Sequence, residues 1–196
     1  MESGFEVIKR SRKHTINILE THTLQIDKIF TERLVLIPFT LLICKNFINN
    51  DFSDLSSMGL KKGKGCPDID ILEILPKIVD NLSRVKAPTG FESWMIVKKD
   101  TLEIIGDLGF KGFNYEEKNI DLGYGIIKKE RQKGYAKEAT TELIKWAFSN
   151  EIVKEITARC LIDNISSVNL LKKLNFKKIK VNDTMAFWSL KNRKRE

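Results

Sequence analysis

Cysteine is scarce in this sequence, whose 196 residues include only Cys44, Cys66 and Cys160. An odd and sparse set of this kind gives no disulfide framework, so we expect a protein of a reducing, cytoplasmic compartment. Histidine is scarcer still. Neither His14 nor His22 has a Cys, Asp or His at ligand spacing, so the sequence indicates no metal site.

Long apolar runs are also missing. The most apolar stretch, residues 34–48, is broken by a proline, a threonine, a lysine and an asparagine. It falls short of the roughly 18 uninterrupted apolar residues that a membrane-spanning helix needs. Residues 1–15 are charged and lack an apolar core of signal-peptide length. We therefore expect neither a membrane partner nor a targeting segment.

The composition that remains is globular, with a basic surplus. Hydrophobic residues make up 42% of the chain and charged residues 31%, and the length suits one domain with a real core. Lys and Arg number 34 against 26 Asp and Glu, and the net charge of +8 favours an anionic ligand or surface. A basic cluster lies at residues 9–13, but no recognition motif accompanies it, so nucleic acid is not the favoured partner. A monomer and a homodimer both remain open.

Strand and helix patterns alternate along most of the chain. We divide it into an N-terminal extension at residues 1–30, a single domain at residues 31–190 and a charged C-terminal tail at residues 191–196. Short links between the central strands favour antiparallel pairing, which predicts an α/β (α+β) fold with a mixed, largely antiparallel central sheet flanked by helices. Helices are expected at 41–48, 68–82, 134–150 and 166–174, and strands at 33–37, 93–98, 103–113, 120–127, 156–161, 176–179 and 185–190.

Two segments leave the pattern ambiguous. Pro76 lies inside the helical pattern of residues 68–82, so either one helix is kinked or a second helix begins there. Residues 59–65 are rich in glycine and lysine but lack both the spacing and the Ser/Thr of a P-loop, so we expect them to form a flexible loop.

The most informative segment is residues 122–136, where a strand enters a basic turn that contains Gly134 and opens into an amphipathic helix. The first N–H groups of a helix have no internal partners and carry the positive end of its dipole. A turn that also aims its own N–H groups inward makes an anion site, and Gly134 lets the backbone approach a ligand closely. This pattern predicts a site for a phosphate or pyrophosphate. An ordinary helix capped by a basic loop is the alternative.

Residues 131–136 (RQKGYA) resemble the R/Q-x-x-G-x-G/A signature of the GNAT superfamily of acetyl-CoA-dependent N-acetyltransferases. Four more segments resemble, in the right order, motifs of its branch that contains the ribosomal-protein N-terminal acetyltransferases, the Rim type. They are residues 31–36 (TERLVL), 105–110 (IGDLGF), 121–124 (DLGY) and 163–176 (DNISS to KLNF). Together the five motifs span most of residues 31–190.

The resemblance implies a GNAT-like fold with acetyl-CoA as cosubstrate. The pantetheine would lie against a splayed strand at Gly125, Ile126 and Ile127. The pyrophosphate would lie on the N–H groups of the loop formed by Arg131, Gln132, Lys133, Gly134, Tyr135 and Ala136. Asn164 would contact the cosubstrate near its thiol end.

Acetyl transfer to an amine also calls for a base. Asp121 replaces the Glu of the branch's E-I-G-Y strand and is the first choice, although it could instead cap a turn or pair with a lysine. Asp107, an ionisable residue inside an otherwise apolar strand, is the alternative. The tyrosine that many family members carry in the late helix corresponds to Leu171, so its hydroxyl is missing. Ser167 would then assist the departing sulfur, unless it only caps the helix.

The activity implied is transfer of the acetyl group of acetyl-CoA to a primary amine, by direct attack in a ternary complex. The acceptor would be a protein N-terminus or a small amine. Because the late tyrosine is missing and the base is uncertain, a catalytically impaired CoA-binding regulatory module is the alternative.

Overall fold

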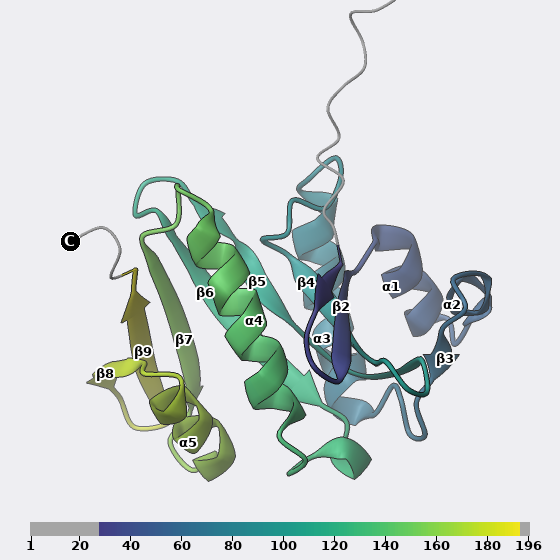
Figure 1. Cartoon of the computed structure of the whole chain (residues 1–196). Coiled ribbons are helices and arrows are strands. Elements are labelled where there is room, and N and C mark those ends of the chain that lie inside the picture. The colour runs from purple at the N-terminus through teal and green to yellow at the C-terminus, as the bar shows by residue number, and fades with distance from the viewer. Residues whose placement is uncertain (1–27, 193–196) are drawn as a thin grey trace, which may run out of the picture.

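The structure, a computed structural model, describes residues 28–192 (Figure 1). The basic cluster at residues 9–13 and both histidines lie outside the described residues. The helices are α1 (Leu41–Ile48), α2 (Ser53–Ser57), α3 (Ile69–Ser83), α4 (Tyr135–Ser149) and α5 (Ile165–Lys173), with a 3-10 turn, η1 (Lys128–Glu130). The strands are β1 (Ile29–Phe30), β2 (Leu34–Pro38), β3 (Lys61–Lys62), β4 (Ser93–Lys98), β5 (Glu103–Asn114), β6 (Asn119–Ile126), β7 (Glu155–Leu161), β8 (Lys177–Val181) and β9 (Met185–Lys191). None of the described helices is long and apolar enough to cross a membrane.

The described strands form one sheet in the order β1-β2-β4-β5-β6-β7-β9-β8, with β3 beside β5. Neighbouring strands are antiparallel except for β6 with β7 and β3 with β5. The β6–β7 pair is parallel because α4 connects the two strands as a crossover helix. The predicted mixed, largely antiparallel sheet with flanking helices is thus confirmed.

Helices cover both faces of this sheet. Trp94 of β4 lies opposite Leu108 of β5, and its ring packs against Trp146 of α4 with the centroids 5.5 Å apart. Successive strand residues point to opposite faces, so Asp107 points to the face on which α1 and α3 pack together. Figure 1 shows α4 in front of the central strands and α3 behind them.

Helix α3 forms one wall of the second face. Asp68 caps its N-terminus by accepting a hydrogen bond from the backbone N–H of Ile71 at 3.2 Å. The buried residues repeat at the helical period: Ile71, Leu75, Ile78 and Leu82. Pro76 lies inside this helix, so the segment is one helix rather than two.

The four predicted helices lie within one residue of their expected ends, but β1, α2 and β3 were not predicted. Residues 59–65, expected to be a loop, include β3, which pairs with the start of β5. A Cβ on Gly63 would lie 2.3 Å from the carbonyl oxygen of Ile104, so glycine allows this close approach. A strand of two residues has no alternating pattern to detect, because a partner distant in the sequence sets its place.

Candidate active site

A cavity of about 1080 Å³ runs between α3, the central part of β5 and β6, and the N-terminal turns of α4 and α5. It brings together most of the residues that the resemblance assigned to the cosubstrate. Those that line it are Gly125, Ile126, Arg131, Gln132, Gly134, Tyr135, Ala136 and Asn164. Ser167 and Asp107 also line the cavity, whereas Ile127, Lys133 and Asp121 are not among its lining residues.

Strands β6 and β7 separate beside this cavity. Their last paired residues are Leu122 and Ala158. β6 continues to Ile126, so residues 123–126 face the cavity without a partner strand on the β7 side. An unpaired strand edge offers N–H and C=O groups to the amides of an extended ligand.

The loop between β6 and α4 presents a row of unpaired backbone N–H groups. Gln132 and Gly134 have left-handed φ angles of 63° and 84°, which turn the chain before α4 begins. No N–H group of residues 132–137 donates to a backbone or side-chain acceptor among the described residues. With the positive end of the α4 dipole, they form a concave site that fits a pyrophosphate.

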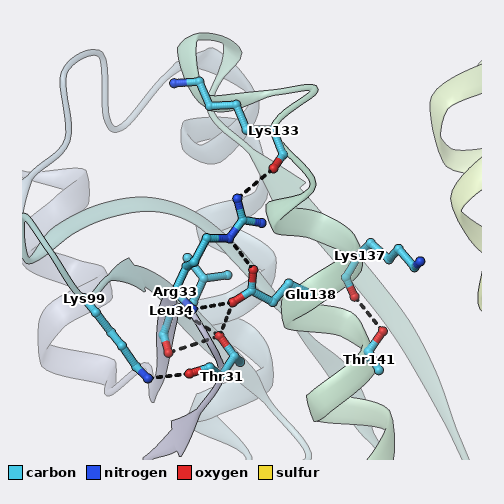
Figure 2. A network of polar contacts seen from close by, with 8 residues as sticks. All are labelled: Thr31, Arg33, Leu34, Lys99, Lys133, Lys137, Glu138 and Thr141. Carbon is cyan, nitrogen blue, oxygen red and sulfur yellow. Dashed lines mark hydrogen bonds and ion pairs between the residues drawn. The ribbon is translucent and has the colours of Figure 1, made fainter.

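A partly exposed polar network holds this loop in place (Figure 2). The Arg33 guanidinium donates to the carbonyl oxygen of Lys133 at 3.1 Å and to the Glu138 carboxylate at 2.7 Å. Glu138 also accepts from the Thr31 hydroxyl at 2.5 Å and from the backbone N–H of Arg33 at 2.7 Å. Burial raises the pKa of Glu138, but the hydrogen bonds from Thr31 and Arg33 outweigh it, so the pKa is lowered and the carboxylate stays charged.

This network contains a residue that sequence reasoning missed. Residues 31–36 resemble a family motif, but no motif of the sequence singles out Glu138. A glutamate in the first turn of the helix after the glycine loop was the available signal. Its partners lie 105 to 107 residues away, so only the fold reveals the contact.

The loop is also joined to α3. The Arg131 side chain donates to the carbonyl oxygen of Ile126 at 2.8 Å and pairs with Asp70 of α3. The backbone N–H of Lys128 donates to Asp68, the residue that caps α3, at 3.1 Å. The side chain of Arg131 therefore links β6 to α3, while its backbone belongs to the anion loop.

Asp121 lies on the same face of β6 as Gly125 but is held by cations. Its carboxylate pairs with Lys111 of β5 and lies 3.6 Å from the guanidinium of Arg159 on β7. It lines a neighbouring cavity of about 500 Å³ rather than the one beside the anion loop. This is the ion-paired arrangement that the sequence left open as the alternative to a catalytic role.

Asp107 lies directly opposite Gly125 in the β5–β6 register. Its Oδ1 atom is 3.0 Å from the place that a Cβ on Gly125 would occupy, so the carboxyl covers this glycine. The residue is only 9% exposed, and no other described side chain hydrogen-bonds or ion-pairs with it. Burial, with a smaller contribution from the charge of Asp68, raises the pKa of Asp107 to about 7.

The first turn of α5 completes the cavity. The helix is capped by Asn164, whose side-chain oxygen accepts from the N–H of Ser167 at 3.0 Å. Capping is therefore not the role of the Ser167 hydroxyl, which lies beside Tyr124 of β6 and hydrogen-bonds with its side chain. Leu171, in the place of the family tyrosine, is buried in the core. Asn175 has a φ of 64°, so the backbone is left-handed in the turn after α5.

Comparison with known proteins identifies relatives over most of the chain. Residues 69–177, more than half of the sequence, match the acetyltransferase (GNAT) domain. The chain is similar to the uncharacterized N-acetyltransferase YjdG of Bacillus subtilis strain 168, with 38% identity over 146 residues. The match covers 74% of this chain and 87% of that protein.

Solved structures share the fold. The ribosomal-protein-S5-alanine acetyltransferase from Vibrio fischeri has a TM-score of 0.61 at 15% identity, and the match covers 87% of this chain and 100% of that one. RimL, a ribosomal L7/L12 α-N-protein acetyltransferase solved with coenzyme A, has a TM-score of 0.60 at 12% identity, covering 84% and 98%. At these identities the likeness supports the architecture, not the acceptor.

Proposed function

This chain belongs to the GNAT family of acetyl-CoA-dependent N-acetyltransferases, and on that basis we propose that it acetylates a primary amine by direct attack in a ternary complex. The observation that carries the proposal is the row of unpaired N–H groups at residues 132–137 beside the open edge of β6. The row suits the negative charge of a pyrophosphate, and the edge suits the amides of pantetheine.

In this proposal, cosubstrate binding falls to backbone atoms. Ile126 offers its backbone groups at the open edge to the pantetheine, while Gly125, whose carbonyl oxygen lies toward β5, leaves room beside them because it has no side chain. Ile127 adds little, because its N–H already donates to the carbonyl oxygen of Ile105 at 2.9 Å. The loop from Arg131 to Ala136 takes the pyrophosphate, with Lys133 acting through its N–H group. Asn164 uses its oxygen as the α5 cap, which leaves its NH₂ group for the ligand.

The chemistry requires three events. The amine loses a proton and attacks the thioester carbonyl carbon, for which the α3 face offers the carboxylates of Asp107 and Asp121. A strand N–H near Ile126 stabilises the oxyanion. The carbon–sulfur bond then breaks, and a thiol with a pKa of roughly 8.5 leaves readily as thiolate. Ser167 lines the cavity beside Tyr124, and its hydroxyl can donate to that sulfur.

The acceptor end of the cavity is basic. Lys77 of α3 and Arg84, which directly follows that helix, line the part away from the anion loop, together with Lys111 and Arg159 of the sheet. The carboxylates that pair with cations there are Asp80, with Arg84, and Asp121, with Lys111 and Arg159, so positive charge remains in excess. Asp121 precedes Gly125 by four residues, or about 13 Å of strand. We therefore favour an extended acceptor, such as a protein N-terminus, that carries an acidic group a few residues beyond its amine.

The test is CoA release from acetyl-CoA, followed with a thiol reagent, over a panel of amines. Two tetrapeptides that differ only by Asp or Lys at their fourth position form the matched pair, beside spermidine and free amino acids. We expect turnover, with a severalfold higher kcat/KM for the Asp peptide that shrinks as salt screens the cleft. Tight acetyl-CoA binding without turnover on any amine would instead favour the CoA-binding regulatory module.

A further inference from the structure

We propose that Asp107, rather than Asp121, accepts the proton of the attacking amine. The proposal rests on the acetyl transfer proposed above and adds the residue that deprotonates the attacking amine. It is carried by the position of a buried carboxyl that has no side-chain partner among the described residues and lines the cavity where the open edge of β6 and the α3 face meet.

The position of Asp107 follows from strand register. It faces Gly125, which lies in the part of β6, residues 123–126, that extends beyond the last β7 pair. Because Gly125 has no side chain, nothing separates the Asp107 carboxyl from the backbone on which the thioester end of the pantetheine would lie. A general base must come within hydrogen-bond reach of the proton that it removes, and among the two candidate carboxylates Asp107 meets that condition.

Within residues 28–192, no cation forms an ion pair with the Asp107 carboxylate. The titratable groups that act on it electrostatically are Asp68 at the start of α3, Cys66 in the preceding segment and Cys44 of α1. Burial raises the pKa of both thiols to about 12, so they stay neutral. Asp68 carries a like charge and is itself occupied by the N–H groups of Ile71 and Lys128. The carboxyl of Asp107 is thus free to take a proton.

Asp121 has the opposite surroundings. Its carboxylate pairs with Lys111 and lies 3.6 Å from the guanidinium of Arg159, so two cations occupy it. It also lies about 13 Å along β6 from Gly125. Its position suits the anchoring of Lys111 and Arg159 in the basic end of the cleft.

The step balances without any further reactant. An ammonium acceptor gives one proton to the Asp107 carboxylate, and the freed nitrogen lone pair forms a bond to the thioester carbonyl carbon. The carbon–sulfur bond breaks with its electron pair on sulfur. The product amide loses its remaining extra proton to the thiolate or to water, and Asp107 returns its proton to solvent.

The decisive pair of variants is Asp107→Asn and Asp121→Asn, assayed with the best acceptor of the panel. We expect kcat of wild type to fall as the pH drops below about 7, which is the acid limb of its pH–rate profile. Asp107→Asn should lower kcat by about 10²-fold or more and abolish this acid limb. The acetyl-CoA-induced rise in melting temperature should persist. Asp121→Asn should keep the acid limb, whatever it does to KM. An acceptor that is already unprotonated at neutral pH, such as hydroxylamine, should recover most of the Asp107→Asn loss.

The proposal is overturned if Asp107→Asn keeps both its rate and its acid limb, or if Asp121→Asn alone removes that limb. Should Asp107→Asn fail to fold, the wild-type profile decides: no ionisation between pH 6 and 8 would contradict the assignment. Absence of turnover by wild-type protein with every amine, despite acetyl-CoA binding, would count against the proposed function and not against Asp107 alone.

Discussion

A carboxyl buried without a cation is costly to a folded protein, and Asp107 is such a group. Its burial, its like-charged neighbour Asp68 and its lack of a side-chain partner all disfavour its charged form. Sites of catalysis commonly keep such unfavourable groups, because function requires them there. Sequence reasoning could flag Asp107 as an ionisable residue in an apolar strand. It could not place it, since Asp68, Cys66 and Cys44 reach it from distant segments.

Stability should carry the signature of this group. An unfolded Asp loses its proton near pH 3.9, whereas folded Asp107 keeps it until about pH 7. Between these values unfolding releases a proton, so the contribution of Asp107 to stability falls as the pH rises and is fully lost above pH 7. Asp107→Asn removes this loss.

We therefore expect Asp107→Asn to melt higher than wild type at pH 8, with little difference at pH 4.5. One kcal/mol corresponds to about 2–4 °C in a chain of this size, and the rise should be of that order or larger. Differential scanning fluorimetry at both pH values measures it. A difference between the two proteins that does not change with pH would show that Asp107 does not titrate as described.

At the scale of elements, the anion loop was predictable and its support was not. Residues 131–136 form a contiguous motif at a strand-to-helix turn, so local chemistry alone indicates the site. The shape of the loop depends on Arg33, Thr31 and Glu138, which Figure 2 shows gathered beneath it from the β1–β2 turn and α4. The short strands β1 and β3 were missed for the same reason, since long-range pairing fixes them.

Arg33→Gln should loosen the loop without unfolding the domain. The substitution removes the hydrogen bond to the Lys133 carbonyl and the ion pair with Glu138. Because Arg33 is half exposed, we expect a moderate effect, a roughly tenfold weaker acetyl-CoA affinity by isothermal titration calorimetry. Lys145→Gln is the control. Its exposed ion pair with Glu142 lies on α4, the helix that also carries Glu138, but neither residue lines the cavity. Equal affinities for the two variants would mean that Arg33 does not support the loop.

At the scale of the whole molecule, the cavity joins an anion loop, an open strand edge and a basic acceptor end on one sheet. The sequence predicted the sheet, its helices and the family, because these follow from periodicity and from motifs in a fixed order. The charge pattern of the acceptor end was not predicted, because α3 and strands β5 and β7 supply its residues together. The net charge of +8 indicated only that a ligand surface would be positively charged, not where on the molecule it lies.

The most direct test of the account is the melting temperature with acetyl-CoA, beside CoA and ATP, for wild type, Gly134→Val and Gly59→Val. Gly134 and Gly59 both have left-handed φ angles, 84° and 71°, so valine strains either backbone, but only Gly134 lies in the anion loop. A ligand at a hundred times its Kd stabilises the native state by about 2.7 kcal/mol, or roughly 5–10 °C here. We expect that shift with acetyl-CoA and CoA for wild type and Gly59→Val, little with ATP, and none for Gly134→Val. No shift for folded wild-type protein, or an undiminished shift for Gly134→Val, would contradict it.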